Sequence, residues 1–572
     1  MIFKDKLLGN ALLIFFFIIG WIIGLLPFRV NLISNFDSFI RLKKDLNNGP
    51  IIRVSDDYVS PNQHSLDILH YDLNIDLYPK EKKLKGIATI TGRILTNQVD
   101  KINLNFYDNL EIKELILNDK YADYKNEDTD LEISANLTSL DTFVLKIVYE
   151  GTPKRSGFSA FTFGEINGAS LIYNLNEPSF ASTWFPCNDI PSDKALLDIR
   201  ITNDSSQTSV SNGKLISIEK NEERSTYYWK TFYPISTYLV CIYSSNYIQF
   251  EDRYITASRD TLPIKYFVLP DHLEKAKVDF KNTPKMIECF SKMFGEYPFI
   301  KEKYGIAEFL WQMGAMEHQT ITGIGSNFVS GNNFFEDIYV HELAHHWWGN
   351  AVGPATWKDI WLNEGFSTYS EAIYAEYKAG KDALKSTMIS KFSDDFVNTL
   401  YNPGKNLFST TIYDKGAWVL HMLRWEVGDS TFFQILRTYF DTYKYKSAST
   451  NDFIKVCENI SGRDLTDFFN QWVFKGTENI TLDYEWYTTK LNDGKYKLTI
   501  ELIQQQVQYN AYTFKLEVKI EYEKGRCESK IIDLNDRKEN FEFVLDEKPK
   551  KLSLDPDNWL LANFRDQNEI QN

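Results

Sequence analysis

Four residues between positions 341 and 364 have the types and spacing of a metal-dependent hydrolytic site. Residues 341–345 read His-Glu-Leu-Ala-His, and 18 residues separate His345 from Glu364. On a helix, positions four apart lie on one face one turn apart, so both imidazoles can bind one ion. Glu364 would complete a shell of two histidines and one glutamate, which in catalytic zinc sites leaves a fourth position open for water. Glu342 adjoins this ion without ligating it.

Two predicted helices must position these residues. Residues 335–349 form a largely apolar run that ends in glycine, which is typical of a buried helix stopped at Gly349. Residues 351–359 contain Gly and Pro and predict a loop, and residues 360–378 predict a second helix that carries Glu364. An ordinary core helix with two hydrogen-bonded histidines is the alternative, and the two well-spaced glutamates favour a zinc hydrolase site over it.

Three further segments carry residue types that suit peptide chemistry. Gly314-Ala315-Met316-Glu317 precedes the zinc motif, Tyr413 stands ahead of an Asp-Lys-Gly turn, and Glu177 lies ten residues before the cysteine of a Phe-Pro-Cys segment. Together with residues 341–364, these motifs make the chain resemble the aminopeptidase N family of gluzincin zinc metallopeptidases, which includes leukotriene A4 hydrolase. The resemblance runs from about Tyr71 to the C-terminus, and the set of motifs is far more specific than the zinc motif alone.

The resemblance implies a role for each matched residue. His341, His345 and Glu364 would bind one Zn²⁺ ion per chain. Glu342 would act as general base and then general acid, and Tyr413 would stabilise the oxyanion of the tetrahedral intermediate. The remaining matched residues would bind substrate: Glu177 and Glu317 the free N-terminal amine, and Gly314, Ala315 and Met316 the extended substrate backbone.

These roles describe a zinc aminopeptidase that removes N-terminal residues from peptides with a free N-terminus. Two alternatives stay open: a zinc endopeptidase with the same metal chemistry, and a non-catalytic relative that acts as a binding module. His318 stands where the family usually has Asn, which puts one side-chain contact with the substrate in doubt. The motifs specify neither the preferred first residue nor an oligomeric state.

Strand and helix patterns, together with the resemblance, predict a multidomain α+β fold. We expect an all-β saddle domain at residues 64–252, a thermolysin-like, mainly helical catalytic domain at 253–476, and a small β-sandwich at 477–572. We also expect a short form of the family that lacks the C-terminal helical domain of larger relatives.

The N-terminus predicts membrane attachment. Leu7 to Phe28 contains no charged residue and is long enough to cross a bilayer. We interpret residues 1–28 as an uncleaved single-pass anchor rather than a signal peptide, residues 29–63 as a polar tether, and the catalytic part as extracytoplasmic. The net charge of −15, from 63 basic and 78 acidic residues, argues against nucleic acid as a partner. Five scattered cysteines indicate no disulfide framework.

Overall fold

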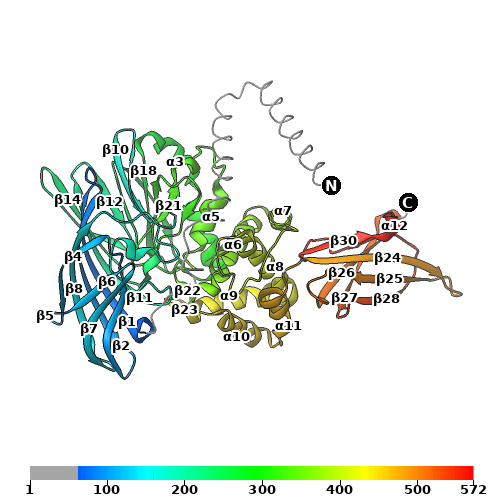
Figure 1. Cartoon of the computed structure of the whole chain (residues 1–572). Helices are drawn as coiled ribbons and strands as arrows, with labels where there is room; N and C mark the ends of the chain where they lie inside the picture. Colours follow the sequence, from blue (N-terminus) through cyan, green and yellow to red (C-terminus); the bar gives the residue numbers. More distant parts are fainter. Residues whose placement is uncertain (1–61, 159, 571–572) are drawn as a thin grey trace, which may run out of the picture.

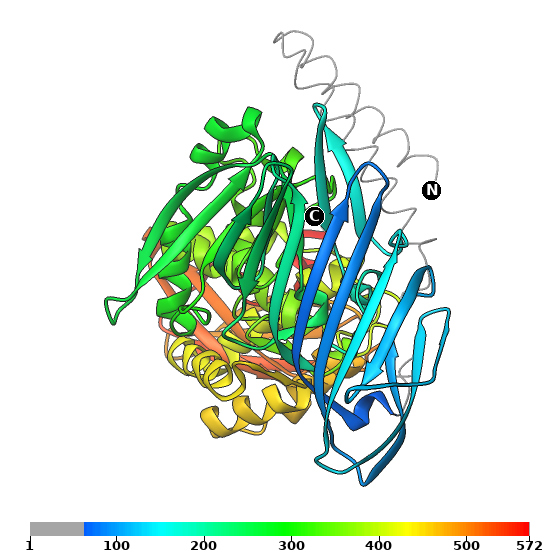
Figure 2. The same cartoon turned by 90° about the vertical axis from the view of Figure 1, so that its left-hand side faces the viewer.

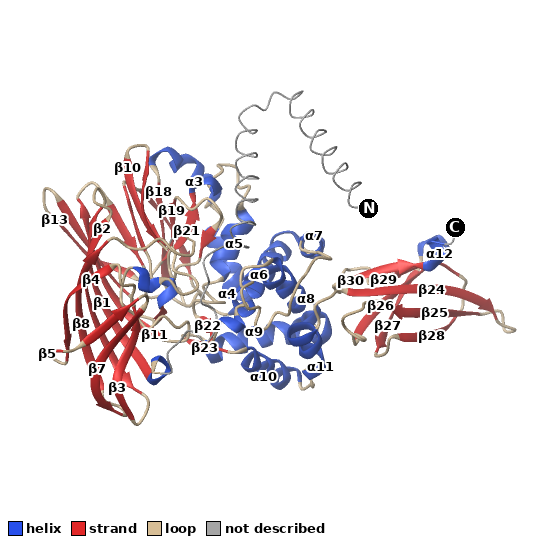
Figure 3. Cartoon of the chain, in the orientation of Figure 1, coloured by secondary structure: helices blue, strands red, loops and turns tan. Residues whose placement is uncertain are grey.

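The computed structural model describes residues 62–158 and 160–570. Three regions follow one another along the chain: long strands first, then helices beside a smaller sheet, then strands again (Figures 1 and 3). The prediction of an all-β N-terminal domain, a mainly helical central domain and a C-terminal β-rich region is confirmed.

A nine-stranded sheet dominates the N-terminal region, and its long strands face the viewer in Figure 2. Strand β1 shows why it forms, because Leu73, Ile75 and Leu77 are buried while the residues between them stay partly exposed. The strand order is β13 (Lys214–Lys220), β14 (Arg224–Lys230), β11 (Lys194–Asp204), β1 (Leu66–Tyr78), β2 (Lys83–Ile94), β8 (Thr142–Gly151), β4 (Leu110–Leu117) and β5 (Lys120–Tyr121), with β15 (Ile235–Ser236) paired to β11.

Two smaller sheets complete this region. The first has the order β3 (Gln98–Asn105), β7 (Asp130–Thr138) and β6 (Tyr124–Glu127). The second has the order β12 (Thr208–Ser211), β16 (Ile242–Ser245), β10 (Ala169–Asn174) and β9 (Phe161–Ile166). Strand β10 ends at Asn174, three residues before Glu177, so this second sheet helps to position one of the residues predicted to bind substrate.

The central region combines a five-stranded sheet with a group of helices. The sheet order is β17 (Ile248–Ile255), β18 (Thr261–Val268), β19 (Tyr304–Phe309), β21 (Thr322–Gly325) and β20 (Ala315–Met316), and β22 (Val352–Pro354) pairs with β23 (Lys446–Ala448). The α-helices are α3 (Leu273–Asp279), α4 (Thr283–Phe294), α5 (Glu336–Ala344), α6 (Trp361–Ala379), α7 (Lys381–Ser390), α8 (Gly416–Val427), α9 (Asp429–Tyr443), α10 (Thr450–Ser461) and α11 (Thr466–Phe469). Two π-helical segments, η8 (Thr411–Lys415) and η9 (Asn470–Lys475), lie among them.

The five-stranded sheet is the main feature of this region that the sequence patterns do not reveal. Every residue of β19 is buried, so the strand lacks the alternation that marks a strand with one exposed face. Strand β19 pairs in parallel with both β18 and β21, and parallel strands inside a sheet are typically covered on both faces by other elements. Strand β17 begins at Ile248 and therefore spans the domain boundary predicted at residue 252.

The N-terminal and central regions meet at the loop that follows α5. The ammonium group of Lys194, on β11, donates to the carbonyl oxygens of Asn350 at 2.7 Å and Ala351 at 3.2 Å. The hydroxyl of Tyr238 donates to the carbonyl of Gly349 at 3.4 Å. The large sheet thereby fixes the loop that joins the two helices of the predicted zinc site.

The C-terminal region consists of two sheets and a short helix. One sheet has the order β28 (Lys538–Leu545), β25 (Tyr496–Gln504), β24 (Ile480–Lys490) and β30 (Ala562–Asp566), and the other β27 (Cys527–Leu534), β26 (Phe514–Tyr522) and β29 (Pro549–Leu554), before α12 (Gln567–Ile570). The Trp559 ring stacks on Trp425 of α8, with centroids 5.7 Å apart, and anchors the region to the helices.

The predicted membrane anchor requires correction. Its segment, residues 1–28, and nearly all of the predicted tether lie outside the described residues. Among residues 62–570, no helix combines the length and the apolar character needed to cross a bilayer. The longest described helix, α6, has 19 residues but carries Glu364, Glu371, Glu376 and Lys378. This finding contradicts the predicted single-pass membrane location and the extracytoplasmic placement that depended on it, and we withdraw both.

Candidate active site

A buried aspartate fixes the start of helix α5, which carries the predicted zinc histidines. The Asp279 carboxylate accepts hydrogen bonds from the backbone amides of Ser330 at 2.6 Å, Gly331 at 2.9 Å and Asn333 at 2.7 Å. These bonds hold the loop that leads into the helix. Glu336 and Asp337 then occupy the first turn, where negative charge is favoured by the helix dipole.

Helix α5 is shorter than predicted, because it ends at Ala344 rather than at Gly349. His345 follows directly and keeps helical backbone angles, and its amide still donates to the His341 carbonyl at 3.2 Å. The next amides bond to carbonyls three residues back, so the chain tightens into turns before the loop. The helical register of His341 and His345 is preserved, which is the part of the prediction that matters for the site.

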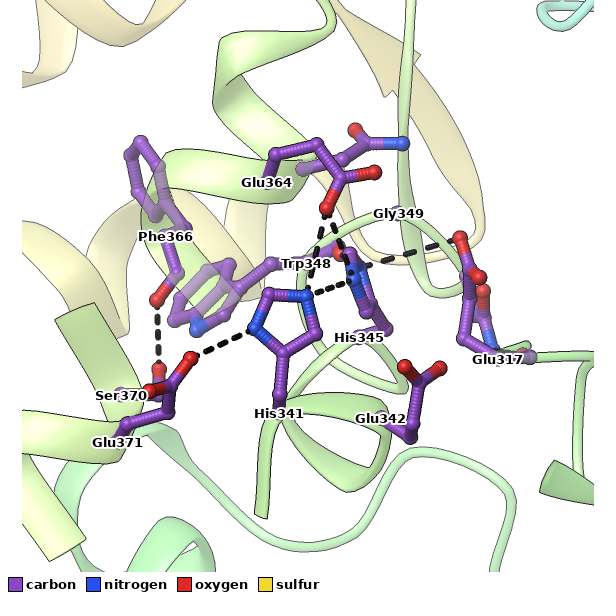
Figure 4. A network of polar contacts seen from close by, with 12 residues as sticks. Glu317, His341, Glu342, His345, Trp348, Gly349, Glu364, Phe366, Ser370 and Glu371 are labelled. Carbon is purple, nitrogen blue, oxygen red and sulfur yellow. Dashed lines mark hydrogen bonds and ion pairs between the residues drawn. The ribbon is translucent and has the colours of Figure 1, made fainter. Parts of the chain in front are cut away.

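Three side chains converge between α5 and α6 (Figure 4). The Nε2 atoms of His341 and His345 are 3.0 Å apart, and Oε2 of Glu364 lies 3.4 Å and 3.3 Å from them. Ligands about 2.1 Å from a tetrahedral zinc ion lie about 3.4 Å from one another. The type and spacing of these three donor atoms therefore fit a zinc ion.

The outer nitrogen of each imidazole is held by an acceptor. Nδ1 of His345 lies 3.0 Å from the carbonyl oxygen of Trp348, which can only accept, so Nδ1 donates and Nε2 keeps its lone pair. Nδ1 of His341 lies 2.9 Å from a carboxylate oxygen of Glu371. The ammonium of Lys391 donates to the other oxygen of Glu371 at 2.6 Å. These contacts orient both rings with their lone pairs toward the shared position.

Three more glutamates are buried beside this position. Glu177, Glu317 and Glu342 each have one carboxylate oxygen without a hydrogen-bond partner among the described residues. Carboxylate oxygens of Glu177, Glu317 and Glu364 lie within 4.8 Å of one another. Burial raises the pKa of Glu342 to about 8, and burial together with the Glu317 charge raises the pKa of Glu177 well above its usual value. In its ionised form such a cluster needs positive charge beside it.

Tyr413 reaches the same site from η8. Its ring stacks on the His341 ring, with centroids 5.8 Å apart and planes at 19°. Burial, reinforced by the charge of Glu364, raises the pKa of the phenol well above its usual value, so the hydroxyl remains a donor at neutral pH. Single π-helical turns of this kind are frequent at functional sites.

A contact between two glycines sets the position of Tyr413 relative to Glu364. A Cβ atom added to Gly416 would lie 2.8 Å from the Cα of Gly365, and one added to Gly365 would lie 2.9 Å from the Cα of Gly416. The backbones of α6 and α8 therefore touch one residue after Glu364 and three residues after Tyr413. Only glycine at both positions permits this approach.

All ten predicted site residues line one cavity of about 350 Å³: Glu177, Gly314, Ala315, Met316, Glu317, His341, Glu342, His345, Glu364 and Tyr413. His318 does not line it, and its Nδ1 instead lies 2.6 Å from the hydroxyl of Tyr243. The cavity also has aromatic walls, including Phe158 and Phe408, that no motif marks because they come from loops distant in sequence.

Comparison with known proteins assigns the chain to a family. Residues 278–472 match the peptidase family M1 domain, and residues 68–239 match the peptidase M1 N-terminal domain. The chain belongs to the peptidase M1 family. The family includes zinc metallopeptidases, and membership implies zinc.

Several M1 proteins resemble this chain at low sequence identity. It is 26% identical to aminopeptidase 2, mitochondrial, of Saccharomyces cerevisiae over 466 residues, which cover 75% of this chain and 48% of that protein. A mutant M1 zinc metallopeptidase of Deinococcus radiodurans, bound to a Tyr-Ser-Ala substrate, is 26% identical with a TM-score of 0.64, covering 73% of this chain and 96% of that one. Legionella pneumophila aminopeptidase A shares the fold at 19% identity and a TM-score of 0.77, covering 90% of this chain and 61% of that one. The chain spans about half the length of the curated relatives it matches.

Proposed function

We propose that this chain is a zinc aminopeptidase that hydrolyses the first peptide bond of peptides with a free N-terminus. The observation that carries the proposal is the buried pair Glu177 and Glu317 beside the His341, His345 and Glu364 donors. A zinc site explains the three donors but not two additional buried carboxylates with unpartnered oxygens. A substrate ammonium group satisfies both carboxylates and supplies the positive charge that they need.

His341, His345 and Glu364 would hold one zinc ion per chain. When bound, the ion supplies a Lewis acid that polarises the scissile carbonyl and lowers the pKa of water. Glu371 and the Trp348 carbonyl keep the two imidazoles in the tautomer that ligation needs.

Glu342 moves the proton. It follows the first ligand on α5, lines the cavity, and has a free carboxylate oxygen. Its carboxylate would take a proton from the attacking water and pass it to the nitrogen of the leaving peptide. Burial raises the pKa of this carboxyl above its usual value, which makes it a stronger base than a solvent-exposed glutamate.

Tyr413 would donate its hydroxyl hydrogen to the carbonyl oxygen as negative charge develops there. Glu177 and Glu317 would hold the ammonium group close to the Glu364 side of the donors, which brings the first peptide bond to Glu342. Gly314, Ala315 and Met316 lie at an edge strand, because β20 pairs only with β21 on one side in the described sheet. The free edge offers backbone groups to an extended substrate.

Blocking the substrate amine tests this function. We expect free amino acid to be released from unblocked dipeptides and aminoacyl anilides, and acetylation of the amine to lower kcat/KM at least about 100-fold, because the charge-assisted bonds to Glu177 and Glu317 are lost. A chelator should abolish the release, and added zinc should restore it. Equal cleavage of acetylated and free peptides would instead identify an endopeptidase.

The contact between Lys391 and Glu371 provides a test of the metal site. We expect Lys391→Met to weaken zinc binding about 10- to 100-fold. Glu371 would then lose the cation that orients its carboxylate toward Nδ1 of His341. Competition with a chromogenic chelator measures the affinity directly. Lys391→Arg should restore most of it, and Lys281→Met, at an exposed position of the same domain, should leave it unchanged. An unaltered zinc affinity in Lys391→Met would show that Lys391 does not support the metal site.

A further inference from the structure

Asn350 joins two parts of the active site that come from separate segments of the chain. It is buried in the loop that follows α5, and its backbone amide donates to the carbonyl oxygen of His345 at 3.0 Å. Its side-chain amide donates through Nδ2 to the carbonyl oxygen of Glu317 at 2.7 Å. A carbonyl oxygen only accepts, so this contact fixes which side of the amide carries the hydrogens. Asn350 therefore bonds directly to a predicted metal ligand and to a residue predicted to bind the substrate amine.

The backbone of Asn350 is fixed to the segment that carries the metal ligands. The amides of Asn350, Ala351 and Val352 each donate to the carbonyl five residues earlier, at 3.0, 3.1 and 3.1 Å. The loop therefore winds back onto the end of α5. From strand β11, the Lys194 ammonium donates to the Asn350 carbonyl at 2.7 Å. These bonds make the side chain of Asn350 a fixed extension of the segment that ends α5 at His345.

Glu317 directly follows the end of a short strand. Strand β20 stops at Met316, so the pairing with β21 does not extend to Glu317. The hydrogen bond to its carbonyl comes from the Asn350 side chain instead. The Glu317 carboxylate points toward the metal-binding donors, with Oε1 3.9 Å from Nδ1 of His345 (Figure 4). The bond from Asn350 therefore helps to determine how far this carboxylate lies from those donors.

We propose that Asn350 is a positioning residue that sets the distance between the Glu317 carboxylate and the metal-binding donors. The inference rests on the proposed aminopeptidase function, in which Glu317 binds the substrate amine. Asn350 does not line the cavity, so it acts through Glu317 rather than on the substrate. One carbon joins the amine to the scissile carbonyl of an α-amino substrate, and the distance must match that length. A misplacement of about 1 Å can lower a rate about 100-fold, so Asn350 favours an amine on the carbon next to the carbonyl.

Two anilides that differ by one methylene group test the inference on the full chain loaded with zinc. Leucine anilide has its amine on the carbon next to the carbonyl, and β-homoleucine anilide has the same side chain with the amine one carbon further away. We expect the wild type to hydrolyse leucine anilide with a kcat/KM at least about 100-fold higher. Asn350→Leu should lower this ratio at least about tenfold, because the Glu317 carbonyl loses its donor. The zinc content should not change, because the backbone bond to His345 remains.

Asn479→Leu is the matched control and should keep the wild-type ratio. Asn479 is also buried, its Nδ2 donates to the carbonyl of Ser393 at 2.8 Å, and it does not line the cavity. If thermal melting shows that Asn350→Leu does not fold, Asn350→Asp decides, because it keeps the shape and replaces the donor with an oxygen. A folded, zinc-loaded Asn350 variant with the wild-type ratio, or an equal loss in Asn479→Leu, would overturn the inference and leave the proposed function intact. No hydrolysis of either anilide by the wild type would overturn both.

Discussion

Glu342→Gln is expected to lower kcat about 100- to 10,000-fold and to leave the zinc content at that of the wild type. Glutamine has nearly the shape and volume of glutamate, so the packing of α5 is kept. It cannot accept a proton, so the attacking water is no longer activated by a base. Steady-state kinetics on a leucine anilide, together with metal analysis of the same sample, measures both quantities.

The same substitution at Glu336 is the matched control. Glu336 lies on the same helix six residues earlier, and its carboxylate binds Asn282 and Lys378 rather than the cavity. We expect Glu336→Gln to keep kcat within about twofold of the wild type, in line with the modest contribution of exposed ion pairs. If Glu342→Gln retained a tenth of the wild-type kcat with full zinc content, another group would have to be the base.

Tyr413→Phe is expected to lower kcat about 100- to 1,000-fold with little change in KM. The ring and its stacking on His341 remain, and only the hydroxyl donor is removed. Its hydrogen bond strengthens as charge develops on the substrate oxygen, so the loss falls on the transition state rather than on substrate binding. Separate determination of kcat and KM distinguishes these two effects.

Tyr401→Phe controls for the loss of a hydroxyl elsewhere in the same stretch of chain. Tyr401 packs on Phe474, with ring centroids 5.2 Å apart, and does not line the cavity. Its variant should behave as the wild type. A rise in KM with unchanged kcat in Tyr413→Phe would show that Tyr413 binds substrate without stabilising the oxyanion.

Local periodicity explains which parts of the site can be predicted from the sequence. His341 and His345 share a helix face, so their spacing alone predicts their proximity. Glu364 lies on a second helix, and its distance in sequence from His345 is part of the zinc motif, so the motif also predicts its place in the site. The contact of Lys391 with Glu371 and the packing of Phe158 against Phe408 join segments far apart in the chain. No periodicity records such contacts, so they appear only in the folded structure.

The elements of the fold can also be divided into those that a local sequence pattern predicts and those that it does not. The alternation in β1 predicts a strand with one buried face, and the structure confirms it. Strand β19 is buried on both faces and carries no such pattern, which is why the sheet of the central region is absent from the prediction. The prediction of a membrane anchor shows another limit of sequence patterns. It rested on the length of the apolar segment before residue 28 and took no account of the rest of the chain.

The contact between Gly365 and Gly416 restricts how this protein can evolve. A methyl group at either position meets the backbone of the other, so neither glycine can be replaced first and the other adjusted later. Each single replacement would separate Tyr413 from Glu364 before any compensating change existed. Lineages that keep the geometry of the site must therefore keep both glycines, whereas the side chains of Phe158 and Phe408 in the cavity lining can change one at a time. The lining of the cavity is open to stepwise change, and the spacing of Tyr413 and Glu364 is not.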